Sequence, residues 1–228
     1  MHKAKSRLTK VLDRLEKFYG KPKPASPADA YEMVLHRICG YPQSDANCDK
    51  GFRALKEQIG LSTSAILNAP DAKLAAALRA GGIVPELRAR RLKEVAARVE
   101  DEFHGNLRSA LELPMNKARK VFKKFPTIGD SYADKILLIT KTAAVGAIPV
   151  TGIHVPLRLG FGKRRGSYAA DYKEAQAAIL AEIPDDISEQ TRAYLLLKRH
   201  AMDTCKANHP KCEECPVTDE CGYFRSVH

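Results

Sequence analysis

The sequence lacks the apolar runs that a signal peptide or a membrane-spanning helix requires. Its first residues, MHKAKSRLTKVLDRLEKFYG, alternate basic and apolar positions instead. No stretch of strand length alternates apolar and polar residues, and no segment repeats at a fixed period. These absences predict an intracellular protein with no membrane partner, and they argue against a β-sheet.

Cysteine is also scarce, with six in 228 residues, but 44% of the residues are hydrophobic, so the chain is long enough to bury a core without disulfides. Apolar residues recur at helical spacing, as at Leu74 and Leu78. Proline and glycine interrupt the pattern often, which indicates short and numerous helices. The predicted fold class is all-α. Helix starts are expected near Ser62 or Asp71, and near Asp171 or Ser188.

The charge is strongly positive, with a formal net charge of +11 and a pI of about 9.4. Lysine and arginine that neutralise phosphates release condensed counterions, so this balance favours a polyanionic partner such as nucleic acid. A basic but inert surface and a ribosome-associated protein are the alternatives that charge alone leaves open.

Four of the six cysteines cluster near the end of the chain in a C-x6-C-x2-C-x5-C pattern. Disulfides are rare in intracellular proteins, and four of only six cysteines are not expected to cluster by chance. We therefore expect a metal centre. Zinc and an iron–sulfur cluster both accept four thiolates, and the spacing leaves both open. Cys39 and Cys48 stand apart and are expected to be small buried hydrophobic residues. The predicted ligands are Cys205, Cys212, Cys215 and Cys221.

The spacer between the first two of these cysteines is short and basic. A metal that fixed both of its ends would present Lys206, His209 and Lys211 as a rigid loop suited to phosphate contacts. The alternative is a solvated loop with ordinary lysines.

A second candidate for nucleic-acid binding is a helix, a tight turn and a helix over residues 115–139. Gly129 ends the turn and permits a close backbone approach, and the amides that begin the next helix form a phosphate site. Thr127, Ile128, Gly129 and Ser131 are therefore candidate DNA contacts. The first helix is basic, although its lysines could be merely solvated.

The F-P-x-I-G hairpin, the basic all-α chain and the cysteine spacing together resemble the endonuclease III family of helix-hairpin-helix DNA glycosylases. His200, five residues before the first cysteine, and the run Pro210-Lys211-Cys212 fit the same family. The resemblance implies a [4Fe-4S] cluster rather than zinc. It also implies a monomer in a bacterial or archaeal cytoplasm that binds double-stranded DNA at a damaged or distorted site.

The resemblance implies two helical domains with a DNA-binding groove between them. Residues 28–142 would form a six-helix domain that includes the hairpin. Residues 1–27 and 143–228 would form the cluster domain. A damaged base would be flipped out of the duplex to be recognised.

Two departures from the family concern its active site. Ser131 stands where bifunctional members place a lysine that attacks the sugar, so lysine-based strand cleavage is not favoured. In the segment that usually supplies an aspartate, the slot holds Thr151 or Gly152, depending on the register, and neither carries a charge.

Candidate helpers in their place are Tyr132, Asp134 and His154, although Asp134 could instead be an exposed partner of a lysine and His154 a packing residue. Gln43 is a weak candidate for the side chain that would fill the space left in the DNA duplex when the damaged base is flipped out. The predicted function is a monofunctional DNA N-glycosylase with an atypical active site, acting on damaged or alkylated bases. The alternative is an inactive or altered structure-specific DNA-binding protein that kept the fold and the cluster.

Overall fold

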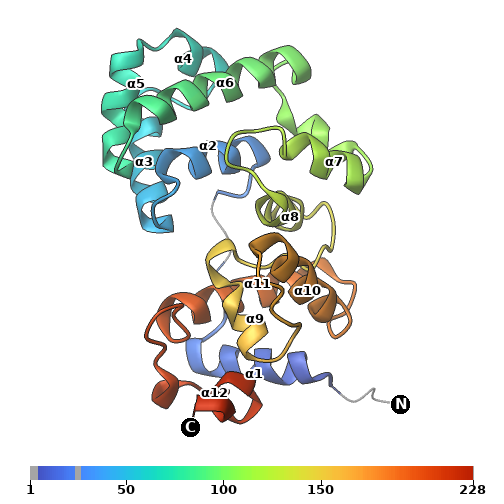
Figure 1. The fold of residues 1–228 in the computed structure, drawn as a ribbon. Coiled ribbons are helices and arrows are strands. Elements are labelled where there is room, and N and C mark those ends of the chain that lie inside the picture. The colour runs from blue at the N-terminus through green and yellow to red at the C-terminus, as the bar shows by residue number, and fades with distance from the viewer. Residues whose placement is uncertain (1–4, 24–26, 228) are drawn as a thin grey trace. The chain divides into compact units, whose positions relative to one another are not determined.

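A computed structural model describes residues 5–23 and 27–227, and within these ranges every regular element is a helix. The all-α prediction is confirmed. By its contacts the chain divides into a central unit, residues 26–129, and a terminal unit, residues 1–25 with 130–228 (Figure 1). None of the described helices is both long enough and apolar enough to cross a membrane.

The central unit is built from helices that are mostly short. Among them α2 packs along α3, and α6, the longest, packs against α4 and α5 (Figure 1). Two 3-10 helices, η1 (Arg79–Gly81) and η2 (Leu107–Glu112), connect them. The α-helices are α2 (Ala30–Gly40), α3 (Asp45–Gln58), α4 (Thr63–Asn68), α5 (Asp71–Leu78), α6 (Pro85–Phe103) and α7 (Met115–Phe122).

Short polar side chains begin several of these helices by accepting hydrogen bonds from backbone amides that have no partner inside the helix. Asp29 caps α2, Ser44 caps α3 and Ser62 caps α4. One helix start was expected near Ser62 or Asp71, and the structure has a helix start at each, since α5 begins at Asp71.

An arginine lies in the core of the central unit. Arg88 on α6 is fully buried, and one guanidinium nitrogen donates to the carbonyls of Cys39 and Leu78, at 3.1 and 3.3 Å. Burial lowers the pKa of Arg88. The side chain therefore ties α6 to the ends of α2 and α5, a role that its place in a basic helix did not indicate.

The terminal unit joins the N-terminal helix to the C-terminal half of the chain. A 3-10 turn, η3 (Val150–Gly152), precedes α9, and η4 (Cys212–Glu214) and η5 (Thr218–Glu220) lie in the cysteine segment. The α-helices are α1 (Arg7–Tyr19), α8 (Asp130–Ile139), α9 (His154–Arg158), α10 (Tyr168–Leu180), α11 (Ile187–Asp203) and α12 (Gly222–Val227).

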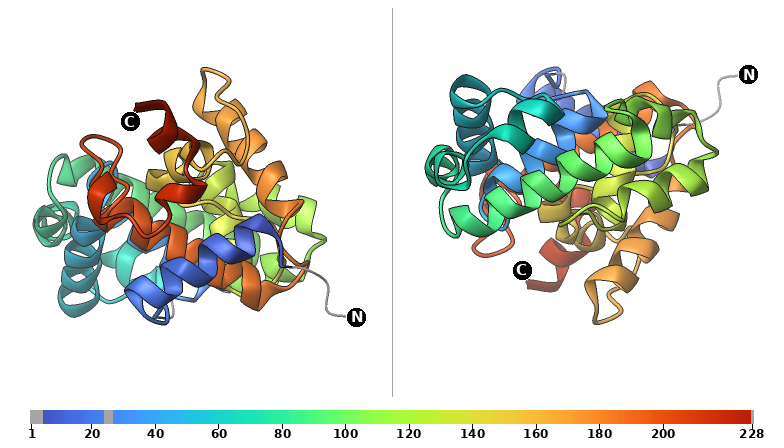
Figure 2. Two further views of the ribbon diagram at one scale, coloured as in Figure 1. Left: turned by 90° about the horizontal axis from the view of Figure 1, so that it is seen from below. Right: turned by 90° about the horizontal axis from the view of Figure 1, so that it is seen from above.

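Helix α1 lies against α11 (Figure 2), because one stripe of α1 is apolar. Leu8, Val11, Leu12 and Leu15 are almost fully buried in the core of this unit. Burying a leucine or valine side chain stabilises a fold by about 1.5–3 kcal/mol, so this stripe is the main attachment of α1.

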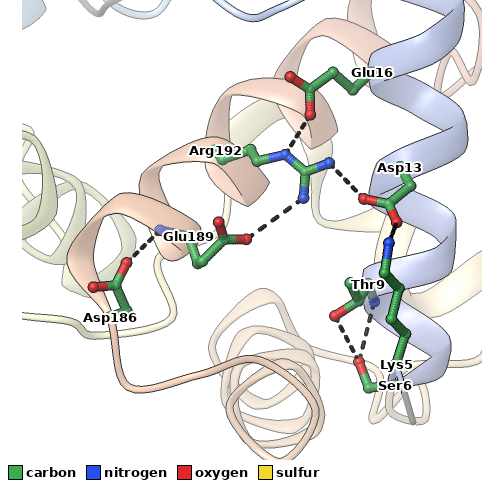
Figure 3. A network of polar contacts seen from close by, with 8 residues as sticks. All are labelled: Lys5, Ser6, Thr9, Asp13, Glu16, Asp186, Glu189 and Arg192. Carbon is green, nitrogen blue, oxygen red and sulfur yellow. Dashed lines mark hydrogen bonds and ion pairs between the residues drawn. The ribbon is translucent and has the colours of Figure 1, made fainter. Parts of the chain in front are cut away.

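A polar network reinforces the same contact (Figure 3). Arg192 on α11 donates to Asp13 at 2.8 Å, bonds Glu16, and pairs with Glu189 at 3.5 Å. Lys5 also donates to Asp13, at 2.7 Å, and this bond is the main reason that the pKa of Asp13 lies below its usual 3.8. The guanidinium thus joins two turns of α1 to α11.

The structure divides the chain at Gly129 and Asp130, inside the hairpin, whereas the sequence-based boundary followed residue 142. The physical reason is α8, which carries fully buried Ile136 and Leu137 and packs against α11. By contacts, α8 therefore groups with the cysteine-bearing half of the chain.

We expect Arg192→Ala to lower the free energy of unfolding by about 1–3 kcal/mol, because hydrogen bonds to charged groups are lost in a partly buried site. A carboxylate whose pKa is depressed by folding adds stability above its unfolded pKa and loses it as the pH falls through the folded one. The Asp13 contribution should thus be present above about pH 4 and disappear below it. Urea unfolding measured from pH 6 to pH 3 should show a weaker acid dependence in the variant.

Arg199→Ala is the matched control, because Arg199 on the same helix pairs with Asp203 at an exposed position. It should change stability by less than about 0.5 kcal/mol. Equal losses from the two substitutions would show that the Arg192 network does not attach α1.

Candidate functional site

The four clustered cysteines line one pocket in the terminal unit. Cys205 follows the end of α11, Cys212 begins η4, Cys215 follows η4, and Cys221 follows η5. Leu159, Val217, Tyr223 and Phe224 complete the lining with apolar surface. The two 3-10 helices turn the chain tightly. Cysteines that a continuous α-helix would separate can therefore line the same pocket.

None of these cysteines forms a disulfide. Within residues 5–23 and 27–227, no three histidine, cysteine or acidic side chains are close enough together to hold one metal ion. The thiols therefore line a cavity rather than converge on a point. Cys39 and Cys48 are buried in the central unit, as predicted, and neither forms a disulfide.

Burial shapes the chemistry of the thiols. It raises the pKa of Cys205, and it raises the pKa of Cys215 to about 11. Arg158 on α9 opposes this effect at Cys205, because its guanidinium donates to Cys205 Sγ at 3.4 Å. Thiols in such a site need a cation or a metal to become thiolates.

Arg158 also fixes the loop that follows Cys205. Its guanidinium donates to the carbonyl oxygens of Lys206 and Ala207, at 2.7 and 2.8 Å, and lies over the Tyr223 ring. Nearby, the backbone amide of Lys211 donates to the Thr204 carbonyl at 2.9 Å. The loop is thus held from both ends.

Lys206, His209 and Lys211 are exposed on this loop. His209 adopts a left-handed backbone conformation, with φ of 53°, which turns the chain sharply at the tip. Lys211 pairs with Glu214 at 3.3 Å. The loop therefore presents three basic side chains on a constrained backbone.

His200 is 1% exposed and lies between the cysteines and α1. Its Nε2 is 3.8 Å from Cys215 Sγ, and its Nδ1 is 2.8 Å from the Tyr19 hydroxyl. The Tyr19 hydroxyl donates to Thr204 at 2.7 Å. Burial lowers the pKa of His200 to about 4, so the ring is neutral at pH 7.

The hairpin turn has an unusual backbone. Thr127 has φ of 67°, a left-handed conformation that costs a β-branched residue about 1–3 kcal/mol. Its hydroxyl oxygen is buried without a hydrogen-bond partner. The Ile128 amide donates to the Phe125 carbonyl at 3.2 Å, and the exposed Gly129 directly precedes α8.

Ser131 lies in the first turn of α8, and its side chain contacts α10. The Tyr168 hydroxyl donates to Ser131 Oγ at 2.9 Å. One helical turn further along both helices, the Tyr172 hydroxyl and the Gln176 amide each donate to an Asp134 oxygen at 2.7 Å.

Asp134 is therefore not the exposed partner of a lysine that the sequence allowed, because it is 1% exposed and bridges two helices. Tyr132 is buried, and the ammonium group of Lys135 lies over its ring, 4.6 Å from the centroid. The i, i+4, i+8 spacing of Tyr168, Tyr172 and Gln176 was the available signal for this polar face of α10, which sequence reasoning missed.

Thr151 and Gly152, the two candidates for the position where the family usually has an aspartate, differ in their surroundings. Thr151 is exposed, whereas a Cβ atom at Gly152 would meet the Cβ of Ala201 at 3.1 Å and that of Pro149 at 3.3 Å. His154 Nε2 donates to the Cys205 carbonyl at 2.6 Å, and burial lowers the pKa of His154. His154 thus attaches α9 to the cysteine segment.

Gln43 belongs to the central unit. Its Oε1 accepts a weak hydrogen bond from Asn47 at 3.5 Å, and its Cγ lies 3.2 Å from where a Cβ of Gly82 would be. The side chain therefore folds back against its own unit in this structure.

No family model matches the chain, but known proteins resemble it over nearly its whole length. The endonuclease III of Sulfolobus acidocaldarius is 26% identical over 197 residues, which are 86% of this chain and 83% of that protein. A trapped covalent intermediate of endonuclease III with DNA shares the fold with a TM-score of 0.76, at 20% identity over 95% of each chain. A thermostable thymine-DNA glycosylase gives a TM-score of 0.74, at 18% identity over 96% of this chain and 97% of that one.

These similarities agree with the motifs that first indicated the family, namely the hairpin and the cysteine spacing. In sequence and in fold, the chain is therefore similar to endonuclease III over nearly its whole length.

Proposed function

We propose that the protein is a base-excision DNA N-glycosylase that hydrolyses the bond between a damaged base and its sugar and leaves the strand uncut. The observation that supports this most is the hydroxyl pair at the start of α8, where Tyr168 donates to Ser131 at 2.9 Å. A Schiff-base lyase needs an amine with a depressed pKa in this place. The hydroxyl pair offers no amine.

The neighbouring amine does not take over that role in this proposal. The ammonium group of Lys135 lies 4.6 Å from the centroid of the Tyr132 ring. A cation–π contact stabilises the charged form of lysine, whereas a nucleophilic lysine must lose its proton. This contact supports hydrolysis by water over attack by an amine.

The lack of a carboxylate in the slot at Thr151 and Gly152 bears on the substrate. Asp134 does not replace it, because Tyr172 and Gln176 already hold this buried side chain. We therefore propose a labile base as the substrate, such as an N-alkylated purine with a positive charge. When its bond to C1′ breaks, the bonding electrons neutralise the base, a water oxygen bonds to C1′, and the water proton passes to solvent. Binding and flipping then supply most of the acceleration.

Contacts with DNA phosphates are proposed at two places. Exposed Gly129 precedes α8, whose first amides lack partners inside the helix and suit an anion. The loop with Lys206, His209 and Lys211 supplies positive charge on a backbone held by Arg158. A single chain with these two contacts would bind a damaged or distorted duplex.

A [4Fe-4S] cluster held by the four clustered cysteines fits the cavity they line. Four thiols that line one pocket, no three of which lie close enough together to hold one ion, suit a cluster of several irons better than one ion, which needs its ligands about 2.3 Å from a single centre. When bound, the cluster would link four thiolates and so fix the segment between Cys205 and Cys221. His154 and Arg158 already bind backbone carbonyls at the start of that segment.

One observation favours the second candidate function, a structure-specific DNA-binding protein. Neither Thr151 nor Gly152 carries a charge, and the nearby His154 is engaged with the Cys205 carbonyl. A protein that had lost excision would keep the same hairpin, loop and cysteines. The first experiment below separates the two functions.

Purified protein should be incubated with duplexes that each carry one oxidised, deaminated, alkylated or mispaired base. We expect strand breaks only after hot alkali, and on the alkylated duplex first, because hydrolysis leaves an uncut abasic strand. Lys135→Ala should cleave like the wild type. Breaks without alkali that borohydride traps would contradict the proposal, and tight, salt-sensitive binding without any cleavage would establish the second function.

Protein purified without oxygen should contain about four irons and four sulfides per chain and absorb visible light. Cys212→Ser should lose most of the iron and the absorbance, because one of four ligands is gone. Cys48→Ser is the control, since this buried thiol lies in the other unit and should leave the iron unchanged. Stoichiometric zinc without visible absorbance would refute the cluster.

Thr151→Asp tests whether the missing charge limits the reaction. The position is exposed, so the variant should fold, and a carboxylate there should raise the excision rate of a neutral damaged base by about tenfold or more. Gly152→Asp should instead lower the free energy of unfolding by about 1–3 kcal/mol, because its Cβ would crowd Ala201.

Thr151→Asn is the matched control for the charge, because it has the same shape as the aspartate. An equal rise in the excision rate with asparagine would show that charge is not what the slot lacks. Single-turnover excision and thermal unfolding measure the two effects separately.

A further inference from the structure

Two tyrosines and a glutamine on α10 form a polar ladder with two residues of α8. Tyr168, Tyr172 and Gln176 are spaced by one turn each, so they share a face of α10. Tyr168 donates to Ser131 at 2.9 Å, and Tyr172 and Gln176 donate to Asp134 at 2.7 Å. Both helices belong to the terminal unit, so the ladder fixes the Ser131 slot within one unit.

The two rungs of the ladder differ in exposure. Tyr172 and Asp134 are 2% and 1% exposed, as expected for a structural contact. Tyr168 is 46% exposed, although its hydroxyl is bonded to nearly buried Ser131 and its ring stacks on Tyr172 with centroids 6.3 Å apart. The hydroxyl end is therefore anchored while much of the ring remains in solvent. A rigid exposed aromatic face is suited to stacking on a base.

The chain directly before Tyr168 is a basic loop pressed onto the same helix. Gly162 has φ of 91°, and a Cβ there would lie 2.9 Å from the backbone of Glu174 on α10. Arg165 bonds Glu174 through two guanidinium nitrogens, at 2.7 and 2.9 Å. Residues 163–169 are all exposed. The loop is thus fixed to α10. Lys163, which follows Gly162, therefore belongs to the same exposed segment as the Tyr168 ring.

Positive charge beside an exposed aromatic ring is the chemistry that binds the phosphates and bases of nucleic acid. The hydroxyl of Ser131 adds a polar group of defined direction. A serine hydroxyl has one hydrogen and two lone pairs, and Tyr168 occupies a lone pair. The hydrogen of Ser131 is thus available for an acceptor on DNA or on an attacking water.

We propose that Tyr168 contacts the DNA directly, stacking its ring on a base while its hydroxyl positions Ser131 at the reacting nucleotide. This inference rests on the proposed function for its second half, the positioning of Ser131. The first half, stacking of the ring on a base, concerns binding alone. The two halves predict different effects of removing the hydroxyl and of removing the ring.

The experiment measures binding and excision separately. Binding is measured with a duplex that carries one tetrahydrofuran abasic-site analogue, and excision as a single-turnover rate on the duplex that the wild type cleaves. Tyr168→Leu removes the aromatic face and should weaken binding by about tenfold or more. Tyr168→Phe keeps the ring, so it should bind like the wild type but excise about tenfold more slowly, as should Ser131→Ala.

Two controls make the result decisive. Phe18→Leu removes another exposed aromatic ring of the terminal unit, 52% exposed on α1, and should leave binding and excision unchanged. The double variant Ser131→Ala with Tyr168→Phe should be no slower than either single variant, because both changes break one hydrogen bond. Circular dichroism verifies that each variant is folded.

Wild-type binding by a folded Tyr168→Leu variant would overturn the stacking role. Additive losses in the double variant would overturn the positioning of Ser131. Failure of the proposed function would look different, because the wild type would then cleave no duplex while Tyr168→Leu still weakened binding to the abasic-site duplex. In that case Tyr168 is a DNA contact of a binding protein, and only the proposed role of its hydroxyl in positioning Ser131 is rejected.

Discussion

The terminal unit depends on bringing four cysteine thiols to one cavity. Between the end of α11 and the start of α12 the chain has only the 3-10 turns η4 and η5, so little of its backbone is held by regular hydrogen bonding. Side chains from elsewhere supply the support instead. Arg158 and His154 bond carbonyls next to Cys205, and His200 connects the Cys215 side of the cavity to Tyr19 on α1. The same core that buries α1 therefore determines where the thiols lie.

Helix α8 connects this cysteine-bearing unit to the hairpin. Gly129 ends the hairpin turn and α8 begins at the next residue, so its first turn combines backbone amides that have no partner inside the helix with the Ser131 hydroxyl. The polar ladder from α10 fixes that turn, because a buried carboxylate such as Asp134 is stable only when donors satisfy it. Backbone strain at Thr127 lies directly before it. These contacts hold the amides that begin α8 and a polar side chain in one short region.

Sequence patterns predicted what depends on spacing alone. A helix was expected to start near Ser62 or Asp71, and one starts at each, while the four cysteines that the spacing grouped line one pocket. The pattern near Asp171 and Ser188 was one turn or less from the true caps, Ser167 and Asp186. Arg88 could not be predicted, because a buried arginine and an exposed one look alike in a basic helix. Its burial depends on which carbonyls the folded backbone leaves nearby.

The same limit explains why the active-site slots were the hardest part to interpret from sequence. A missing charge at Thr151 and Gly152 is visible in the sequence, but whether another group replaces it depends on tertiary contacts. Those contacts tie Asp134 to α10 and His154 to the Cys205 carbonyl, so neither titratable group faces open solvent as a replacement. What the start of α8 presents is neutral and polar, the hydroxyls of Ser131 and Tyr168. Neutral hydroxyls stabilise a developing cation less than a carboxylate does, so under the proposed function the substrate is a base that is already charged when it leaves.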